Sequence, residues 1–156
     1  MLIKELFSEY TDNIPNPVGR GELLKICHSK DGKQMVLFAK FTQLQRFDNL
    51  DEFERAAAKA VGLDYLRVKC RYTPDMLDAK YTGEAVKRLK QDMAVINGHL
   101  NGAFYYIDDN IVHIELKRGG AELLSRAGFE NALAKLLNEE FSVKLTVKLI
   151  EKQTEQ

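Results

Sequence analysis

The sequence contains only two cysteines, Cys27 and Cys70, and no Asn-x-Ser/Thr sequon. Both cysteines lie in runs with strand character, where a free cysteine behaves as a small hydrophobic residue. No apolar run reaches the length of roughly 18 residues that a membrane-spanning helix needs. Charged residues also follow Met1 too closely for a signal peptide. We therefore expect a cytoplasmic protein with reduced thiols and no membrane partner.

The sequence also lacks net charge, because 23 basic side chains balance 23 acidic ones. Residues 1–77 carry 12 basic and 11 acidic side chains, and residues 78–156 carry 11 and 12. Neither half is therefore a module that binds a phosphate backbone by its overall charge. Any such binding requires a local basic patch.

Catalytic and metal-binding patterns are scarce as well. His28, His99 and His113 are scattered without metal-type spacing, and there is no P-loop, no G-x-G-x-x-G and no nucleophile elbow. The adjacent Asp108 and Asp109 suit a hairpin turn better than acid–base chemistry. We predict no catalytic residue, no metal ligand and no cofactor. An independent small enzyme is the third hypothesis, after two binding roles described below.

The first half predicts a β-β-α-β module over residues 1–77, with a linker at 73–82. A short helix is expected within 1–12, and the Pro- and Gly-rich segment 13–21 is expected to lack regular structure. Asp31-Gly32 predicts a hairpin with a type I′ turn. Asn49 is expected to cap a helix that ends at Gly62. The strands are expected at 22–29, 34–41 and 65–72, and the helix at 50–61. In the first strand, Leu24 and Ile26 are expected on one face.

The second half, residues 78–156, predicts the order α-β-β-α-α-β. Apolar residues at helical spacing predict the helices, and strict alternation predicts the last strand. The first helix is expected at 83–96, capped by Thr82 and ended by Asn97-Gly98. Two further helices are expected at 121–127 and 130–140. The strands are expected at 103–107, 111–117 and 142–150, before a polar tail. The chain is therefore expected to be an α+β protein of two small sheet-plus-helix modules. The second module resembles the type II KH fold in its element order.

Two cationic segments are the candidate binding residues. Arg67, Lys69 and Arg71 share one face of the predicted strand 65–72, with about 7 Å between neighbours. This basic stripe suits a phosphate backbone or an acidic partner, or is simply the solvated face of a sheet. Lys117, Arg118, Gly119 and Gly120 lie where a strand leads into a helix, and free amides at a helix start attract phosphate. The alternative there is a tight strand-to-helix turn.

A KH domain grips nucleic acid with a G-x-x-G loop, which in the type II order falls between the two consecutive helices. Here that position is occupied by residues 126–131, RAGFEN, with a single glycine and an acidic residue. The sequence therefore lacks the G-x-x-G loop with which a KH domain binds nucleic acid.

The run GGAELLSRAGFENALAKLLNEEF (119–141) and its flanking strands resemble the N-terminal region of the PolC-type DNA polymerase III alpha subunit of Gram-positive bacteria. The segments ELFSEY (5–10), IP and G-x-G-E within 14–22, and VKCRY (68–72) are similar to the start of that polymerase. In that family this region precedes an oligonucleotide-binding domain, a proofreading exonuclease and the polymerase core. The family's catalytic carboxylates have no counterpart positions here, which implies an excised or truncated N-terminal piece.

The resemblance implies a non-catalytic, protein-docking adaptor for DNA replication. The second module is similar in fold to the polymerase-binding domain of the clamp-loader tau subunit, so a replisome protein such as tau is the expected partner. The alternative is a KH-like module that binds single-stranded DNA directly. Both hypotheses draw on the candidate residues Arg67, Lys69, Arg71, Lys117, Arg118, Gly119 and Gly120.

Overall fold

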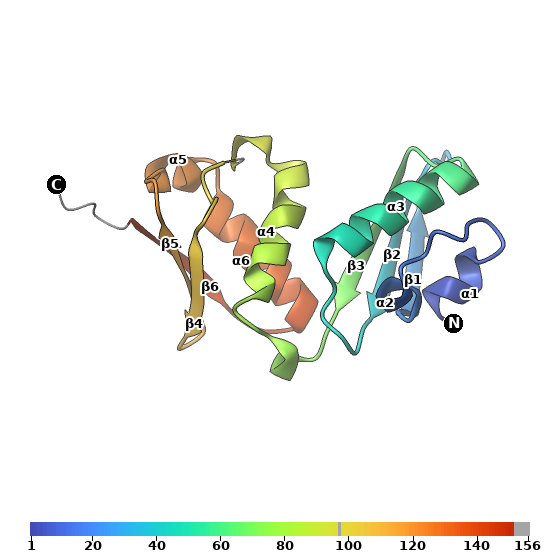
Figure 1. Ribbon diagram of the computed structural model, residues 1–156, viewed down its shortest axis with the longest axis horizontal. Coiled ribbons are helices and arrows are strands. Elements are labelled where there is room, and N and C mark those ends of the chain that lie inside the picture. Colours follow the sequence, from blue (N-terminus) through green and yellow to red (C-terminus); the bar gives the residue numbers. More distant parts are fainter. Residues whose placement is uncertain (97, 152–156) are drawn as a thin grey trace. The chain divides into compact units, whose positions relative to one another are not determined.

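The computed structural model describes residues 1–96 and 98–151 of the chain, so the helix end predicted at Asn97 and the tail 152–156 lie outside the described residues. The chain divides into two compact units, Met1–Met76 and Leu77–Gln156. Each described unit contains one three-stranded sheet with helices, which makes the protein α+β (Figure 1). We describe each unit by itself.

The sheet of the first unit has the order β1-β2-β3. β1 (Glu22–His28) pairs antiparallel with β2 (Gln34–Lys40), and β2 pairs parallel with β3 (Tyr65–Arg71). The parallel pair is connected by α3 (Phe47–Val61), as a parallel crossover requires. The smaller elements are α1 (Ile3–Phe7), α2 (Asn16–Gly19) and the 3₁₀ turn η1 (Pro74–Met76).

α3 packs on one face of the sheet, α2 contacts α3, and α1 contacts α2 and, through Phe7, α3. Leu37 and Val68 are register partners beneath α3, and both are buried, as is Phe53 from the helix. Phe7 of α1 meets Phe53 edge-to-face, with ring centroids 5.2 Å apart. The core of the first unit therefore lies between β1-β2-β3 and the helices, and the opposite face of the sheet carries no helix of this unit (Figure 1).

Two local predictions for the first unit are wrong and two are confirmed. The helix α3 begins at Phe47 after an extended Arg46, so Asn49 is inside the helix rather than its cap. Gly62 does end it, in the left-handed conformation with φ of 81°. The segment 13–21 contains α2, because Pro17 occupies the first turn, where a missing amide hydrogen costs no hydrogen bond. The short helix expected within residues 1–12 is confirmed and spans Ile3–Phe7.

The hairpin between β1 and β2 also differs from the predicted turn. Only Gly32 has a positive φ, 71°, so the turn is not type I′. The carboxylate of Asp31 instead accepts hydrogen bonds from the Ser29 hydroxyl and from the Lys33 amide, and these lower the pKa of Asp31. A register shift between Leu23 and Lys25 makes a β-bulge that leaves Leu24 without a register partner, which interrupts the alternation expected to place Leu24 and Ile26 on one face.

The second unit shows the predicted element order. α4 (Tyr81–Asp92) begins after Lys80, not at Thr82, and is followed by the 3₁₀ turn η2 (Ala94–Ile96). β4 (Phe104–Asp108) pairs antiparallel with β5 (Ile111–Leu116), which pairs parallel with β6 (Thr146–Glu151), so the sheet order is β4-β5-β6. The helices between the parallel strands are α5 (Ala121–Arg126) and α6 (Phe129–Phe141).

The helices of the second unit cover one face of its sheet. Val112, Ile114 and Leu116 of β5 are fully buried, as are Leu133 and Leu137 of α6. This face therefore forms the core of the unit, and α5 and α6 lie against it (Figure 1).

Two connections of the second unit have identifiable causes. Asp109 and Asn110 both have positive φ, 51° and 61°, so the turn without glycine takes the hairpin conformation that short polar residues tolerate. The last strand begins later than predicted. Ser142 is left-handed, with φ of 53°, and the Leu145 amide donates to the Asn138 side chain, 2.8 Å away, before regular pairing starts at Thr146.

Candidate functional site

The predicted basic stripe lies on β3, on the sheet face opposite α3. Arg67, Lys69 and Arg71 alternate with residues that are buried under the helix. Lys69 is exposed, and the two arginines are half-buried. The structure therefore brings the three predicted cations together on one open surface.

The centre of this surface is the ring of Phe38 on β2. Lys25 and Lys69 are its register partners on the two neighbouring strands. Their ammonium nitrogens each lie 5.8 Å from the ring centroid, and the guanidinium carbon of Arg71 lies 5.1 Å from it. Three cations drawn from two strands thus gather around one half-buried aromatic ring.

A second ring extends the same surface along β3. The guanidinium carbon of Arg67 lies 5.3 Å from the centroid of Tyr65, whose side chain is 38% exposed. Cations within about 6 Å of an aromatic centroid are attracted by its quadrupole, by roughly 0.5–1 kcal/mol at exposed sites. The rings therefore hold the cationic groups near fixed positions, although the groups carry like charges.

We call this surface the cationic face. It contains five cations, and by register one carboxylate, that of Glu22, lies beside it opposite Lys40. Among the described residues, Lys25, Lys69 and Arg71 form no ion pair with a carboxylate. The face has a strongly positive local potential in a chain without net charge. Its members are Lys25, Phe38, Lys40, Tyr65, Arg67, Lys69 and Arg71.

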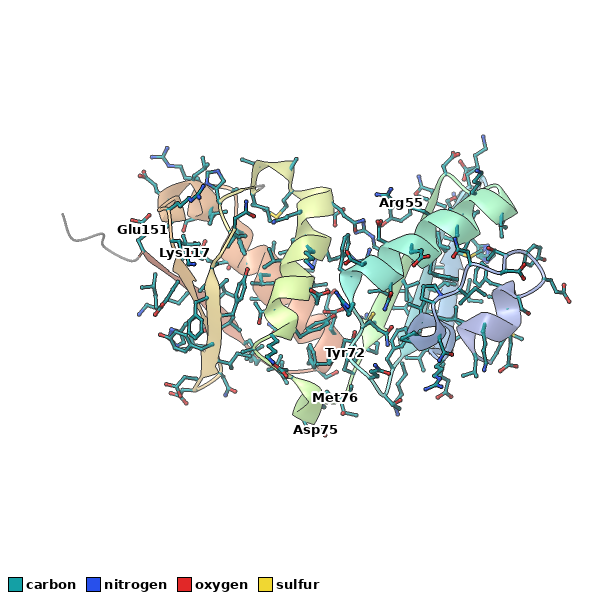
Figure 2. All side chains as sticks on the ribbon, viewed as in Figure 1. Arg55, Tyr72, Asp75, Met76, Lys117 and Glu151 are labelled. Atoms are coloured by element: carbon teal, nitrogen blue, oxygen red, sulfur yellow. The ribbon has the colours of Figure 1, made fainter. Side chains whose placement is uncertain are left out.

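The second predicted site, at residues 117–120, has a different environment. Lys117 and Arg118 are exposed, and Gly119 and Gly120 have φ values of 71° and 96°. The first amide of α5, at Ala121, already donates to Glu151 Oε1 at 2.9 Å. Lys117 and Glu151 are labelled in Figure 2. A phosphate would have to displace this carboxylate, so the turn is a weaker candidate than the cationic face.

The open face of the second sheet carries an aromatic patch that we define as Phe104, Tyr106 and His113. Tyr106 stacks on His113, its cross-strand partner, with centroids 4.5 Å apart and planes 10° apart. Phe104 lies 5.9 Å from Tyr106 by centroids and is 59% exposed. Glu115 and Lys148 flank the rings by register. The patch is thus aromatic and close to neutral.

Sequence reasoning missed Phe38, Lys25 and the aromatic patch. The signal for Phe38 was its alternation with buried residues in β2, which places it on the same face as Lys40. Lys25 lies on the face opposite Ile26, as alternation along β1 implies, but its pairing with Phe38 follows only from the register of the hairpin. Phe104 and Tyr106 are two residues apart on β4, so they share one face of the sheet, as the residues of the basic stripe do on β3.

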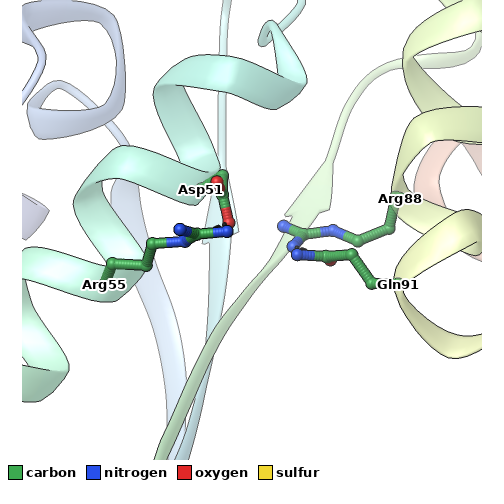
Figure 3. Close-up of polar contacts among 4 residues, drawn as sticks. All are labelled: Asp51, Arg55, Arg88 and Gln91. Carbon is green, nitrogen blue, oxygen red and sulfur yellow. Dashed lines mark hydrogen bonds and ion pairs between the residues drawn. The ribbon is translucent and has the colours of Figure 1, made fainter.

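The remaining titratable groups form no further site. Within residues 1–96 and 98–151, no group of three or more His, Cys, Asp or Glu side chains is placed to hold a metal ion. Figure 3 shows two pairs that lie along helices: Arg55 with Asp51 at 3.1 Å in α3, and Arg88 donating to Gln91 at 2.9 Å in α4. Pairs at this spacing support the helix by a few tenths of a kcal/mol.

No family model matches the chain, and no curated protein matches it. None of the helices within the described part of the chain has the length and apolar character to cross a bilayer.

Proposed function

We propose that the chain is a non-catalytic region of a bacterial replicative DNA polymerase and that it docks a protein of the replisome in the cytoplasm. The resemblance of residues 119–141 and of the shorter N-terminal segments to the PolC-type polymerase supports this assignment. Two small α+β units, each with one sheet face free of its own helices, suit a binding role.

The aromatic patch is the observation that supports protein docking best. Protein interfaces are enriched in aromatic residues and depleted of charge at their centre. Phe104 is 59% exposed beside the stacked Tyr106 and His113. Aromatic side chains already held against one another lose little conformational freedom on binding, so they are suited to act as anchors.

The clamp-loader tau subunit is the first partner to test. The resemblance implies contacts within the replisome, and tau joins the polymerase to the clamp loader. A partner that covers the patch must present an apolar surface with a carboxylate near Lys148 and a cation near Glu115, since both charges flank the rings by register. This complementarity would set the register of the complex more than its affinity.

The experiment is affinity capture of purified tau by the full chain, followed by calorimetry. Phe104→Ser is expected to weaken binding at least tenfold, in the range of a hot-spot residue of about 2 kcal/mol. Val95→Ser is the matched control, because Val95 is another exposed apolar residue of the same unit, at 50% against 59% for Phe104. Equal losses in the two variants would argue against the patch. Absence of capture with well-folded protein, for tau and for other replisome proteins, would argue against the docking role itself.

A further inference from the structure

We propose that the cationic face of the first unit binds single-stranded nucleic acid. Its cations would contact successive phosphates, and the rings of Phe38 and Tyr65 would contact bases. This site belongs to the first unit, whereas the KH-like element order belongs to the second half of the chain. It is independent of the protein-docking role proposed above.

The charges on the face fit an extended polyanion. Neighbouring cations along β3 are separated by about 7 Å, and adjacent strands lie about 4.8 Å apart. Arg67, Lys69 and Arg71 therefore form a row, and Lys25 and Lys40 lie beside it on the neighbouring strands. A single strand carries one phosphate per nucleotide at a comparable repeat. Several phosphates are thus contacted together without any rearrangement of the sheet.

The aromatic rings decide between a nucleic acid and an acidic peptide. An acidic peptide satisfies the cations but offers nothing for the rings of Phe38 and Tyr65. A nucleotide supplies a phosphate for the cation and a base with a π-face for the ring beside it. Proteins that bind single strands without sequence preference combine these two elements, a positive surface and aromatic side chains. Here both occur at one position, because Lys25, Lys69 and Arg71 lie around Phe38.

The open sheet also favours a single strand over a duplex. The bases of a duplex are paired and stacked inside the helix, so the rings would meet only backbone. On an open sheet, unstacked bases reach aromatic side chains directly, as they do in other sheet-based readers of single strands. Phe38 is half-buried and Tyr65 is 38% exposed, so neither ring projects fully from the sheet. A base must therefore approach them flat along the sheet, which a single strand allows.

The test is fluorescence anisotropy of a labelled oligothymidylate of about 12 nucleotides with the full chain, over a range of salt concentrations. We expect binding that weakens steeply with salt. Lys69→Glu should lower the affinity about tenfold and reduce the log–log salt slope by roughly 0.7, the value for one phosphate contact on a single strand. Lys59→Glu is the matched control, since Lys59 is exposed on α3 and gives the same change in net charge.

A second variant separates stacking from charge. Phe38→Leu should lower the affinity about tenfold, because a base–aromatic contact is lost. Tyr10→Leu, which removes an exposed ring away from the sheet, is its control. Circular dichroism checks that each variant is folded, and Lys69→Gln provides a milder charge change should Lys69→Glu unfold.

Three results would overturn the proposal. No binding of the oligothymidylate at low salt removes it outright. Equal losses in Lys69→Glu and Lys59→Glu show bulk charge instead of a site. Polyglutamate or a duplex of the same length that competes as well as the single strand shows a generic anion surface. The tau capture experiment is independent of all three, so the docking role stands or falls separately.

Discussion

Lys69 and Phe38 are register partners on adjacent parallel strands, and the Lys69 ammonium lies 5.8 Å from the Phe38 ring centroid. Lys25 occupies the equivalent position on the other side of the ring, also at 5.8 Å. One ring thus joins all three strands of the sheet through its cationic neighbours. The cationic face is therefore centred on the Phe38 ring.

This relationship predicts how the fold responds to loss of the ring. Phe38→Leu should reduce the free energy of unfolding by about 1–2 kcal/mol, because it removes part of the buried ring surface and weakens the cation–π contacts. Urea denaturation followed by circular dichroism measures the change. Screening by salt should also increase the stability of the variant more than that of the native protein, since the like charges lose the ring whose attraction offsets their repulsion. An identical salt response in both proteins would contradict this account.

The buried carboxylate of Glu54 predicts a larger effect. Its Oε2 atom accepts a hydrogen bond from the Val68 amide at 2.7 Å and so ties α3 to β3, an edge strand. Glu54→Ala removes this hydrogen bond to a buried carboxylate, which should cost about 1–3 kcal/mol. Glu54→Gln retains an acceptor oxygen and should cost less. Hydrogen exchange at the Val68 amide checks the cause, since exchange should accelerate in the Ala variant well beyond the Gln variant.

The elements that the sequence predicts well are those with a long periodic signal. The alternation in 65–72 places Arg67, Lys69 and Arg71 on one face, and helical spacing predicts α6. Both follow from local geometry, because a side chain's face is set by the period of its own element. The α+β class and the order of the second half follow from the same signals.

The parts that the sequence does not predict depend on contacts between elements. Asn49 is a good cap by composition, yet α3 starts at Phe47, because the extended backbone of Arg46 ends the preceding loop earlier. The pairing of Lys25 with Phe38 is set by the register of the hairpin, and the bulge beside Leu24 shifts the partners of Glu22 and Leu23, which nothing in the local sequence fixes. Which residues make up the cationic face therefore depends on the strand register, which is a tertiary property.

Gly120 and Gly62 provide a matched pair for backbone strain. Both have positive φ, 96° and 81°. A Cβ at Gly120 would lie 2.9 Å from His99 Nδ1, whereas a Cβ at Gly62 would meet nothing within 4 Å. Each change to Ala carries the left-handed penalty of about 1 kcal/mol, and Gly120→Ala adds the displacement of His99. Thermal unfolding should show the greater loss for Gly120→Ala. Equal losses would mean that His99 moves without cost.

At the 117–120 turn, we predict that binding of phosphate to the Ala121 amide depends on Glu151. Its carboxylate accepts from the Ala121 amide at 2.9 Å, so inorganic phosphate should cause no shift of that amide resonance in the native protein. Glu151→Ala frees the amide and removes the competing negative charge. A phosphate-dependent shift at Ala121 should then appear, with a loss of stability of about 0.5–1 kcal/mol. A strong shift in the native protein would show that the turn binds anions despite Glu151.

Tyr105 predicts how the second unit responds to alkali. Burial raises the pKa of its hydroxyl to about 12, against an ordinary value of 10.0. The unfolded chain therefore loses this proton at lower pH than the folded chain does. Above pH 10 the unfolded state binds fewer protons, so the free energy of unfolding falls as pH rises from about 10 to 12. The full shift corresponds to about 2.7 kcal/mol, and partial exposure reduces this to roughly 1–2 kcal/mol.

Tyr105→Phe tests this directly, because it keeps the ring and removes the titrating group. Urea denaturation at pH 8 and at pH 11 should show a smaller alkaline loss in the variant than in the native protein. The difference between the two proteins isolates Tyr105 from the other groups that titrate in alkali. Because Tyr105 pairs with the fully buried Ile114 on the helix-covered face, the variant should also retain the fold at neutral pH. Parallel losses in the two proteins would show that ionised Tyr105 reaches solvent without unfolding.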